Sequence, residues 1–316
     1  MQEKINKLKE ELSKVIIGHS NMIDGVLMGL FSNGHIILES VPGLAKTTMI
    51  KTLANALDLN FKRVQFTPDL LPSDIIGAEI YDQKSSEFKI KKGPVFTNLL
   101  LADEINRAPA KVQSALLEVM QEKQVTISGQ SFSISEPFLV LATQNPLDQI
   151  GAYELPQAQL DRFMLKILLD YNTIEEELQI AKTFSVKNPT KIDKILNTED
   201  LATIKQEIEQ VYIDDEVQKY MINLIFATRY PKNYKGLEEI EKYIEYGASP
   251  RGSIDLFKAS KAYAYINGKN FVTPDDIKLI FKDVLRHRIT LSFDAISNDI
   301  TADFILEQIL SEVLVP

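Results

Sequence analysis

Several absences limit what this chain of 316 residues can be. It has no cysteine, which excludes disulfides and cysteine-based zinc sites and is compatible with a reducing compartment. Nowhere do about 18 apolar residues follow one another, the minimum for a membrane-spanning helix, so we expect no membrane insertion. The first residues mix lysine and glutamate with apolar side chains and lack the apolar centre of a signal peptide. The cytoplasm is therefore the expected location.

Positive charge is also scarce. The 35 lysines and arginines are outnumbered by 44 acidic residues, which gives a net charge of −9. A protein that coats nucleic acid needs clustered cations to displace counterions from the phosphates, so this balance argues against broad nucleic-acid binding. The length exceeds what one hydrophobic core usually supports, and we expect one larger and one smaller domain.

The first half of the chain alternates short apolar runs with helical patterns, which is typical of a layered α/β domain. The apolar runs predict buried strands at 36–38, 64–66, 95–102 and 138–143. Helical patterns at 47–57 and 111–121 lie between them. Two hairpins, at 78–90 and 125–134, are predicted as insertions in this domain.

After residue 170 the strand-like runs largely stop, and an all-helical second domain is expected. Its clearest helical patterns lie at 217–227, 253–265 and 275–281. Thr273 and Pro274 have the residue types of a helix N-cap and first helical position. Polar residues and a proline within 185–191 indicate the boundary, so the predicted domains are 1–186 and 187–316.

One loop of the first domain has the residue types of a phosphate-binding site. It follows a predicted strand and opens a predicted helix, where backbone N–H groups converge on an anion. Its residues are Val41, Pro42, Gly43, Leu44, Ala45, Lys46, Thr47 and Thr48. Lys46 would reach the terminal phosphates of a nucleotide, and the Thr47 hydroxyl would bind Mg²⁺.

The strict phosphate-loop pattern fails at two glycine positions, which hold Ser40 and Ala45. Ala45 costs little if its backbone keeps a negative φ, because N–H groups rather than side chains form the cradle. On this stretch alone, an ordinary strand, turn and helix with an exposed lysine remains an alternative. Residues elsewhere in the chain must decide between the two.

Polar residues at the ends of two later strands support the interpretation of this loop as a phosphate-binding site. Asp103 and Glu104 follow an apolar strand, and the carboxyl ends of strands face the ligand in open α/β sheets. Asp103 would hold Mg²⁺ and Glu104 would polarise the attacking water. Asn145 follows the next strand and could orient the same water. Solvated acids at a strand end and an ordinary Asn-Pro turn are the alternatives.

Two arginines complete the series. Arg162 and Arg251 each lie at the edge of a predicted secondary-structure element. The planar guanidinium group of arginine has a geometry that suits phosphate binding. Either one alone would be interpreted as a surface residue, and only the ordered series favours a function. The histidines His35 and His287 show no metal-ligand spacing and are interpreted as structural or solvated.

The order of these parts resembles the AAA+ ATPases, and within them the MoxR family. The resemblance runs from about residue 15 to about residue 290 and rests on six blocks: VPGLAKT at 41–47, QFTPDLLPSD at 65–74, ADEINRAP at 102–109, QNP at 144–146, LPQAQLDRF at 155–163 and ASPR at 248–251. It implies a P-loop αβα core with two inserted hairpins and a smaller helical C-terminal lid. It also implies ATP and Mg²⁺ as cofactors.

The resemblance further implies a role for each candidate residue. Lys46 and Thr47 would belong to Walker A, Asp103 and Glu104 to Walker B, Asn145 would be sensor 1, Arg162 the arginine finger offered to a neighbouring subunit, and Arg251 sensor 2 from the lid. Ile17, Gly18 and His19 fall where such proteins line the adenine pocket, although His19 replaces the usual glutamine. Shared sites imply a homo-oligomer, typically a hexameric ring.

Three functions are compatible with these observations. The first is a chaperone-like motor that hydrolyses ATP to remodel, mature or insert cofactors into protein clients, possibly with a partner that carries a von Willebrand A domain. The second is a nucleotide-controlled scaffold with slow turnover, against which Glu104, Asn145 and Arg162 argue. The third is a DNA or RNA translocase, which four lysines near the first hairpin support only weakly: Lys84, Lys89, Lys91 and Lys92.

Overall fold

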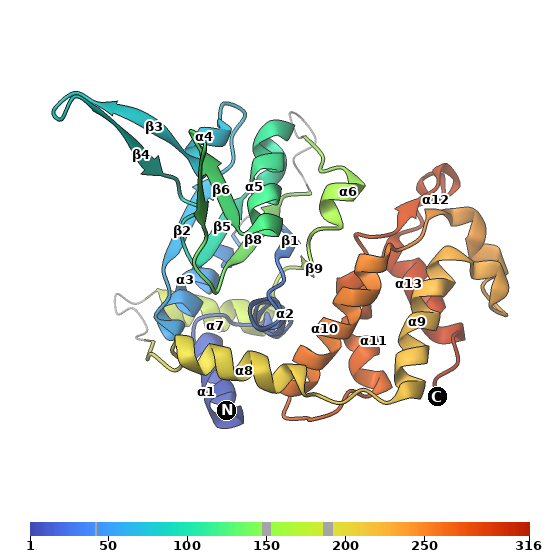
Figure 1. Cartoon of the computed structure of the whole chain (residues 1–316). Coiled ribbons are helices and arrows are strands. Elements are labelled where there is room, and N and C mark those ends of the chain that lie inside the picture. The colour runs from blue at the N-terminus through green and yellow to red at the C-terminus, as the bar shows by residue number, and fades with distance from the viewer. Residues whose placement is uncertain (42, 147–152, 186–191) are drawn as a thin grey trace.

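The computed structural model describes residues 1–41, 43–146, 153–185 and 192–316 (Figure 1). Its N-terminal part is built on a five-stranded sheet in the order β2-β5-β8-β1-β9, and neighbouring strands are parallel. These strands are β1 (Ile36–Ser40), β2 (Phe61–Gln65), β5 (Leu99–Asp103), β8 (Leu139–Gln144) and β9 (Leu165–Leu169). Most of the predicted domain boundary lies outside the described residues, and its position stays a prediction.

Several strands differ from the sequence prediction. β2 begins at Phe61 and not at residue 64. β5 starts at Leu99 and not at residue 95, because the Val95 N–H donates to the Ile75 carbonyl instead of joining the sheet. β9 was not predicted. It lies at the edge of the sheet, where Lys166 forms an ion pair of 2.6 Å with Glu39 of β1. This ion pair compensates the charge of Lys166, so that a strand with a lysine can join the sheet at its edge.

Although α6 and α7 have no buried residue, the helices that cover the sheet do so with one apolar face. In α5, for example, Val112, Leu116 and Met120 are buried, as their spacing predicted. The helices of this part are α1 (Gln2–Ser13), α2 (Ser20–Phe31), α3 (Lys46–Leu57), α4 (Pro72–Ile76), the 3₁₀ turn η1 (Ile105–Arg107), α5 (Ala110–Glu122), α6 (Gln157–Leu160) and α7 (Ile174–Phe184).

Both predicted hairpins are present. They are antiparallel pairs, and the first extends away from the body of the molecule in Figure 1. Their strands are β3 (Gly77–Asp82) with β4 (Glu87–Lys92), and β6 (Gln124–Ile127) with β7 (Gln130–Ser133).

The C-terminal part is helical, with one addition that the sequence did not predict. A small antiparallel pair, β10 with β11, joins two segments about 45 residues apart in the chain. The elements are α8 (Thr198–Glu209), α9 (Asp215–Arg229), η2 (Pro231–Asn233), η3 (Glu238–Tyr243), β10 (Ile244–Tyr246), α10 (Pro250–Ile266), α11 (Pro274–Leu285), β11 (Thr290–Leu291), α12 (Phe293–Ser297) and α13 (Ala302–Glu312). None of the helices in the described ranges is long and apolar enough to cross a membrane.

The two parts share a hydrophobic core. Helix α10 packs on α2 and α11 packs on β9, so the helical part covers the β9 side of the sheet (Figure 1). One cluster of buried apolar residues contains Leu27 of α2, Leu165 of β9 and Phe281 of α11. The helical part is therefore anchored to α2 and to β9, the strand that pairs with β1.

Helix α11, which packs on β9, begins at an N-cap whose contribution to stability can be tested. Thr273 Oγ1 accepts from the Asp276 N–H (3.3 Å), and Asp276 Oδ2 accepts from the Thr273 N–H (2.9 Å). We expect Thr273→Ala to lower the free energy of unfolding by about 1 kcal/mol, measured by urea denaturation. Thr203→Ala, on the exposed face of α8, should change it by less than about 0.5 kcal/mol. Equal effects of both substitutions would contradict the role of the cap.

Candidate functional site

The predicted phosphate loop connects the carboxyl end of β1 to the first turn of α3. The structure places Lys46 and Thr47 at the start of α3, so the free N–H groups of that turn face the loop. Gly43 has a φ of +95°, and a side chain added there would meet nothing within 4 Å. The space beside Gly43 is therefore open. Pro42 lies outside the described residues.

The condition under which Ala45 would cost little, a negative φ, is not met. Ala45 has a φ of +50° and a ψ of +16°, the left-handed conformation that glycine adopts without strain. Its N–H donates to the Gly43 carbonyl at 3.0 Å, which closes the loop immediately before α3. For alanine this conformation costs roughly 1–2 kcal/mol. Such strain is typical of functional loops, where the surrounding structure imposes it.

Lys46 lies close to the acids that follow β5. Partial burial lowers the pKa of Lys46, and the charges of Asp103 and Glu104 oppose that shift. Within the described residues the Lys46 ammonium forms no ion pair, although it is partly removed from water. A partly desolvated, unpaired cation beside a helix N-terminus fits the terminal phosphates of a nucleotide.

The two acids are held by a threonine of the neighbouring strand. Thr143 of β8 is fully buried, and its hydroxyl donates to Asp103 Oδ1 at 2.7 Å. The same hydroxyl accepts from the Glu104 N–H at 2.8 Å. Glu104 itself has a φ of +56°, a second strained residue at this edge of the sheet. Asn145 is buried directly after β8, next to this group.

Three polar residues that the sequence did not single out also contact the acids. Arg63 of β2 forms an ion pair with Asp103 at 2.6 Å. Gln65 of β2 donates to Glu104 Oε2 at 2.7 Å, and Arg107 binds the same oxygen at 2.9 Å. The signal was present in the sequence, since Arg63 and Gln65 alternate along a strand that ends beside Asp103. Without knowledge of the strand order, this neighbourhood could not be predicted.

The proposed adenine segment lies against the start of α7. Gly18 has a φ of +84°, and a side chain added there would approach Asn172 Nδ2 to 2.2 Å. The same Asn172 amide donates to the Ile17 carbonyl at 3.0 Å. His19 is buried, and its Nε2 has no hydrogen-bond partner within the described ranges. This ring nitrogen is a buried polar group that the described residues leave unsatisfied.

A hollow of about 780 Å³ opens beside the phosphate loop. Val15, just before the adenine segment, lines it together with Thr47 and Thr48 of α3 and Phe184 of α7. Its size lies within the range of small-molecule sites. Elements from three parts of the sequence therefore surround the start of α3.

The structure does not bring Arg162 to the phosphate loop of its own chain. Arg162 precedes β9, whose first residue pairs with Ile36 at the start of β1, whereas the loop follows Ser40 at the other end. The length of β1 alone separates these two ends by about 13 Å. Arg162 donates to the Leu117 carbonyl at 3.3 Å, and its Nε is buried without a hydrogen-bond partner among the described residues.

Arg251 lies with Arg162 at this far end of the sheet. Its guanidinium contacts Asp161 at 3.4 Å, next to Arg162 in the chain. Asp161 also accepts from Ser249 Oγ at 2.9 Å and from the buried Arg288 at 3.0 Å. Arg251 and Arg162 thus lie together at one end of the sheet, away from Lys46.

The two histidines have structural roles. His35 Nδ1 accepts from the Val140 N–H (3.0 Å) while its Nε2 lies 3.1 Å from the Met120 carbonyl. Burial lowers the pKa of His35 to about 4. His287 Nε2 contacts the Phe163 carbonyl at 2.8 Å, and burial lowers its pKa as well.

Comparisons with known proteins agree with this arrangement. Residues 35–165 match the family model "ATPase family associated with various cellular activities (AAA)", and residues 238–309 match an AAA lid domain. The chain is 43% identical to Chaperone MoxR1 of Mycobacterium tuberculosis, over 97% of this chain and 81% of that protein. The chain belongs to the MoxR family of AAA+ ATPases. It is an ATPase with a P-loop αβα core and a helical lid.

Further relatives cover nearly the whole chain. The uncharacterised protein YeaC of Bacillus subtilis is 39% identical over 99% of this chain and 95% of its own length. Protein MoxR of Methylorubrum extorquens is 26% identical over 90% of this chain. The crystal structure of a presumed ATPase from Cytophaga hutchinsonii superposes with a TM-score of 0.94 at 50% identity, covering 100% of this chain and 96% of that one.

The strain at Ala45 can be measured directly. Because glycine accepts a positive φ without cost, we expect Ala45→Gly to raise the free energy of unfolding by about 1 kcal/mol in urea denaturation. The matched control is Ala202→Gly on the exposed face of α8, where the same change should lower it by about 1 kcal/mol. If Ala45→Gly also destabilises the protein, residue 45 is not strained in solution.

Proposed function

We propose that this MoxR-family ATPase binds ATP with Mg²⁺ and hydrolyses it in a homo-oligomeric ring to remodel protein clients. The observation that carries the proposal is the grouping of Lys46, Asp103 and Glu104 at the carboxyl end of the sheet, with Thr143 fixing both acids. Phosphoryl transfer depends on charge compensation and a positioned nucleophile, and this group offers both.

Each residue at this edge has a distinct proposed task. Lys46 and the N–H groups of the loop hold the terminal phosphates, while Thr47 and Asp103 hold Mg²⁺, which supplies positive charge to the phosphate oxygens. Glu104 polarises the attacking water and Asn145 helps to orient it. The remaining loop residues, including Pro42, Gly43, Leu44, Ala45 and Thr48, line the phosphates, and Ile17, Gly18 and His19 line the adenine.

Gln65 and Arg107 set the starting position of Glu104. Both bind its Oε2, so this oxygen is satisfied and the carboxylate is held in one orientation. Arg63 similarly holds Asp103 Oδ2, which limits the directions from which that acid can reach a metal. We assign all three as positioning residues of the hydrolytic step.

The ring follows from the position of the two arginines. Arg162 and Arg251 share one face at the far end of the sheet from their own phosphate loop, so they would serve the nucleotide of the neighbouring subunit. A hexamer is the proposed size. Successive head-to-tail contacts of this kind close into a ring when the rotation between subunits is suitable.

The client class is proposed from the relatives. Chaperone MoxR1 is named as a chaperone, which supports a protein client for this chain too. A partner with a von Willebrand A domain and action in the cytoplasm are further parts of the proposal. The division into domains 1–186 and 187–316 accompanies it, with nucleotide binding assigned to the first.

Substitutions of the two key residues separate binding from hydrolysis. Lys46→Ala should weaken ATP binding, because it removes the cation that faces the phosphates. Glu104→Gln should keep binding and lower turnover by about 10²-fold or more, because an amide does not polarise the water. Binding is measured with a fluorescent ATP analogue and turnover by phosphate release. Lys62→Ala, on the exposed part of β2, is the control. Wild-type turnover by Glu104→Gln would contradict the catalytic assignment of Glu104, and no turnover by the assembled wild-type protein would favour the scaffold.

Mixed rings test whether sites are shared. Arg162→Ala alone should bind ATP and fail to hydrolyse it, and so should Glu104→Gln alone. Mixing the two variants under assembling conditions should restore part of the turnover, because some interfaces then combine an intact Glu104 with an intact Arg162. Mixing Glu104→Gln with Lys46→Ala, which damages the same side of the interface, provides the matched comparison. No recovery in rings of confirmed mixed composition would contradict an arginine finger in trans.

A further inference from the structure

Helix α7 (Ile174–Phe184) is a well-formed helix that has no buried residue. Its start is fixed by a capping box between Thr173 and Glu176, so it does not need burial to form. Ile174 is 85% exposed and Leu178 is 53% exposed, one turn apart on the same face. Tyr171, just before the helix, is 71% exposed. An apolar helix face of this kind usually marks a contact surface.

Negative charge flanks the apolar face of α7. Glu175 and Glu177 are exposed, and within the described parts of the chain neither forms an ion pair. Helical geometry places them on either side of Ile174. A partner surface for α7 should therefore combine apolar side chains with positive charge.

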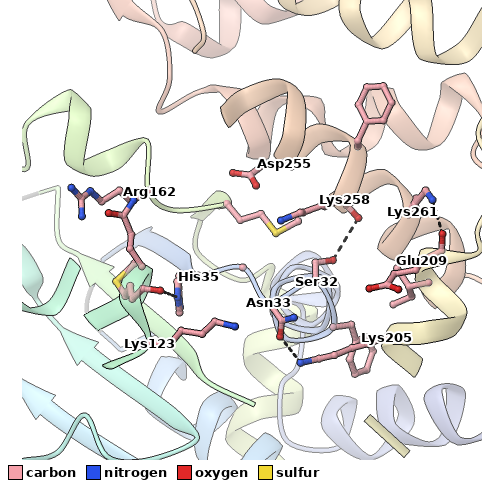
Figure 2. Close-up of a pocket in the computed structure, with 17 residues that line it drawn as sticks. Ser32, Asn33, His35, Lys123, Arg162, Lys205, Glu209, Asp255, Lys258 and Lys261 are labelled. Atoms are coloured by element: carbon pink, nitrogen blue, oxygen red, sulfur yellow. Dashed lines mark hydrogen bonds between the residues drawn. The ribbon is translucent and has the colours of Figure 1, made fainter. Parts of the chain in front are cut away.

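A second surface of the same chain has that composition. A hollow of about 660 Å³, here called the basic hollow, lies between the end of α2, the end of α5, α8 and α10 (Figure 2). Its cations are Lys123, Arg162, Lys205, Lys258 and Lys261, and its acids are Glu209 and Asp255. Its apolar lining is Phe31, Met120, Met164, Ile208 and Phe257.

Most of the positive charge of the basic hollow has no ion-pair partner among the described residues. Lys123 is the exception, since it forms an ion pair with Glu136 at 2.6 Å. Asp255 is engaged by the buried Arg288 at 2.5 Å and so does not offset the lysines. The Lys258 ammonium forms no hydrogen bond or ion pair with any described residue. Lys205 binds the Asn33 side chain, a neutral partner, and burial lowers its pKa. Figure 2 shows Lys123 and Lys258 directed into the space between α5 and α10.

We propose that α7 of one subunit docks in the basic hollow of the next subunit of the ring. Ile174 and Leu178 would pack on the apolar lining, and Glu175 and Glu177 would face the lysines at its rim. This inference rests on the proposed function, because it needs a head-to-tail assembly.

The positions of the two surfaces support this pairing. α7 begins beside Gly18 and ends at Phe184, which lines the same hollow as Thr47 and Thr48. The basic hollow, in turn, is lined by Arg162. Docking of α7 would thus bring the phosphate loop of one subunit toward the proposed arginine finger of its neighbour. Two different surfaces of one chain meet, which is the geometry of a heterologous ring contact.

Engineered cysteines test the contact, and the chain offers a background without cysteine. Leu178→Cys marks α7, and Ser32→Cys marks the rim of the basic hollow with a conservative change. The two variants are mixed with ATP and Mg²⁺, treated with a short bismaleimide and separated on a denaturing gel. We expect a cross-linked pair from the mixture and none from either variant alone.

The controls separate this inference from the ring itself. Leu279 is exposed on α11 (66%, against 53% for Leu178) and lies outside the basic hollow, so Leu279→Cys with Ser32→Cys should give no cross-link. If rings form and hydrolyse ATP while the Leu178→Cys mixture gives no cross-link, the docking is wrong and the ring stands. If the chain neither assembles nor hydrolyses ATP, the docking and the proposed function both fail.

A second variant tests how much the docking of α7 contributes to assembly. Ile174→Ser combined with Leu178→Ser changes only exposed side chains, so the thermal midpoint of unfolding and ATP binding should stay near wild type. Assembly should weaken on the order of tenfold, and turnover per chain at limiting concentration should fall with it. Lys258→Glu should weaken assembly in the same way, and Lys278→Glu on α11 should not. Assembly of wild-type strength in both the serine and the Lys258→Glu variants would overturn the docking.

Discussion

The parallel register of the central sheet is the constraint on which the site depends. Because β1, β5 and β8 run in the same direction and are paired side by side, the residues that follow them arrive at one edge. Phosphate loop, acids and Asn145 are thereby brought together from segments up to about 100 residues apart. Thr143 then fixes the two acids within that edge. Without the register, no local feature of these loops would form a site.

The same register separates the site into two halves. A parallel strand that pairs with β1 must start where β1 starts, so the segment that precedes β9 lies at the end opposite to the phosphate loop. Arg162 is located there by the topology and not by any local signal. With Arg162 as the proposed arginine finger, a complete catalytic set would combine residues of two chains, and oligomerisation would be a condition for activity rather than an accessory to it.

The sequence predicted those features that are local or periodic. Buried strands such as β8 were found by their apolar runs, and the acids after β5 by their position at a strand end. β9 was missed because Lys166 interrupts its apolar pattern, and only Glu39 on the neighbouring strand compensates that charge. The positive φ of Ala45 was missed because the closed loop imposes it, against the preference of alanine. The contact of Arg251 with Asp161 joins residues 90 positions apart, beyond what periodicity can reveal.

Asp161 precedes Arg162 in the chain and accepts hydrogen bonds from Ser249, Arg251 and Arg288. These bonds connect Asp161 to the start of α10 and to the segment that follows α11. Breaking a buried ion pair by removing one partner costs about 3–5 kcal/mol, several times thermal energy. The segment of Arg162 and the lid helices should therefore move as one rigid unit. In mechanical terms, Asp161 is a rigid coupling: in the proposed ring, a displacement of Arg162 by a neighbouring subunit would reach the lid through these bonds and not through flexible chain.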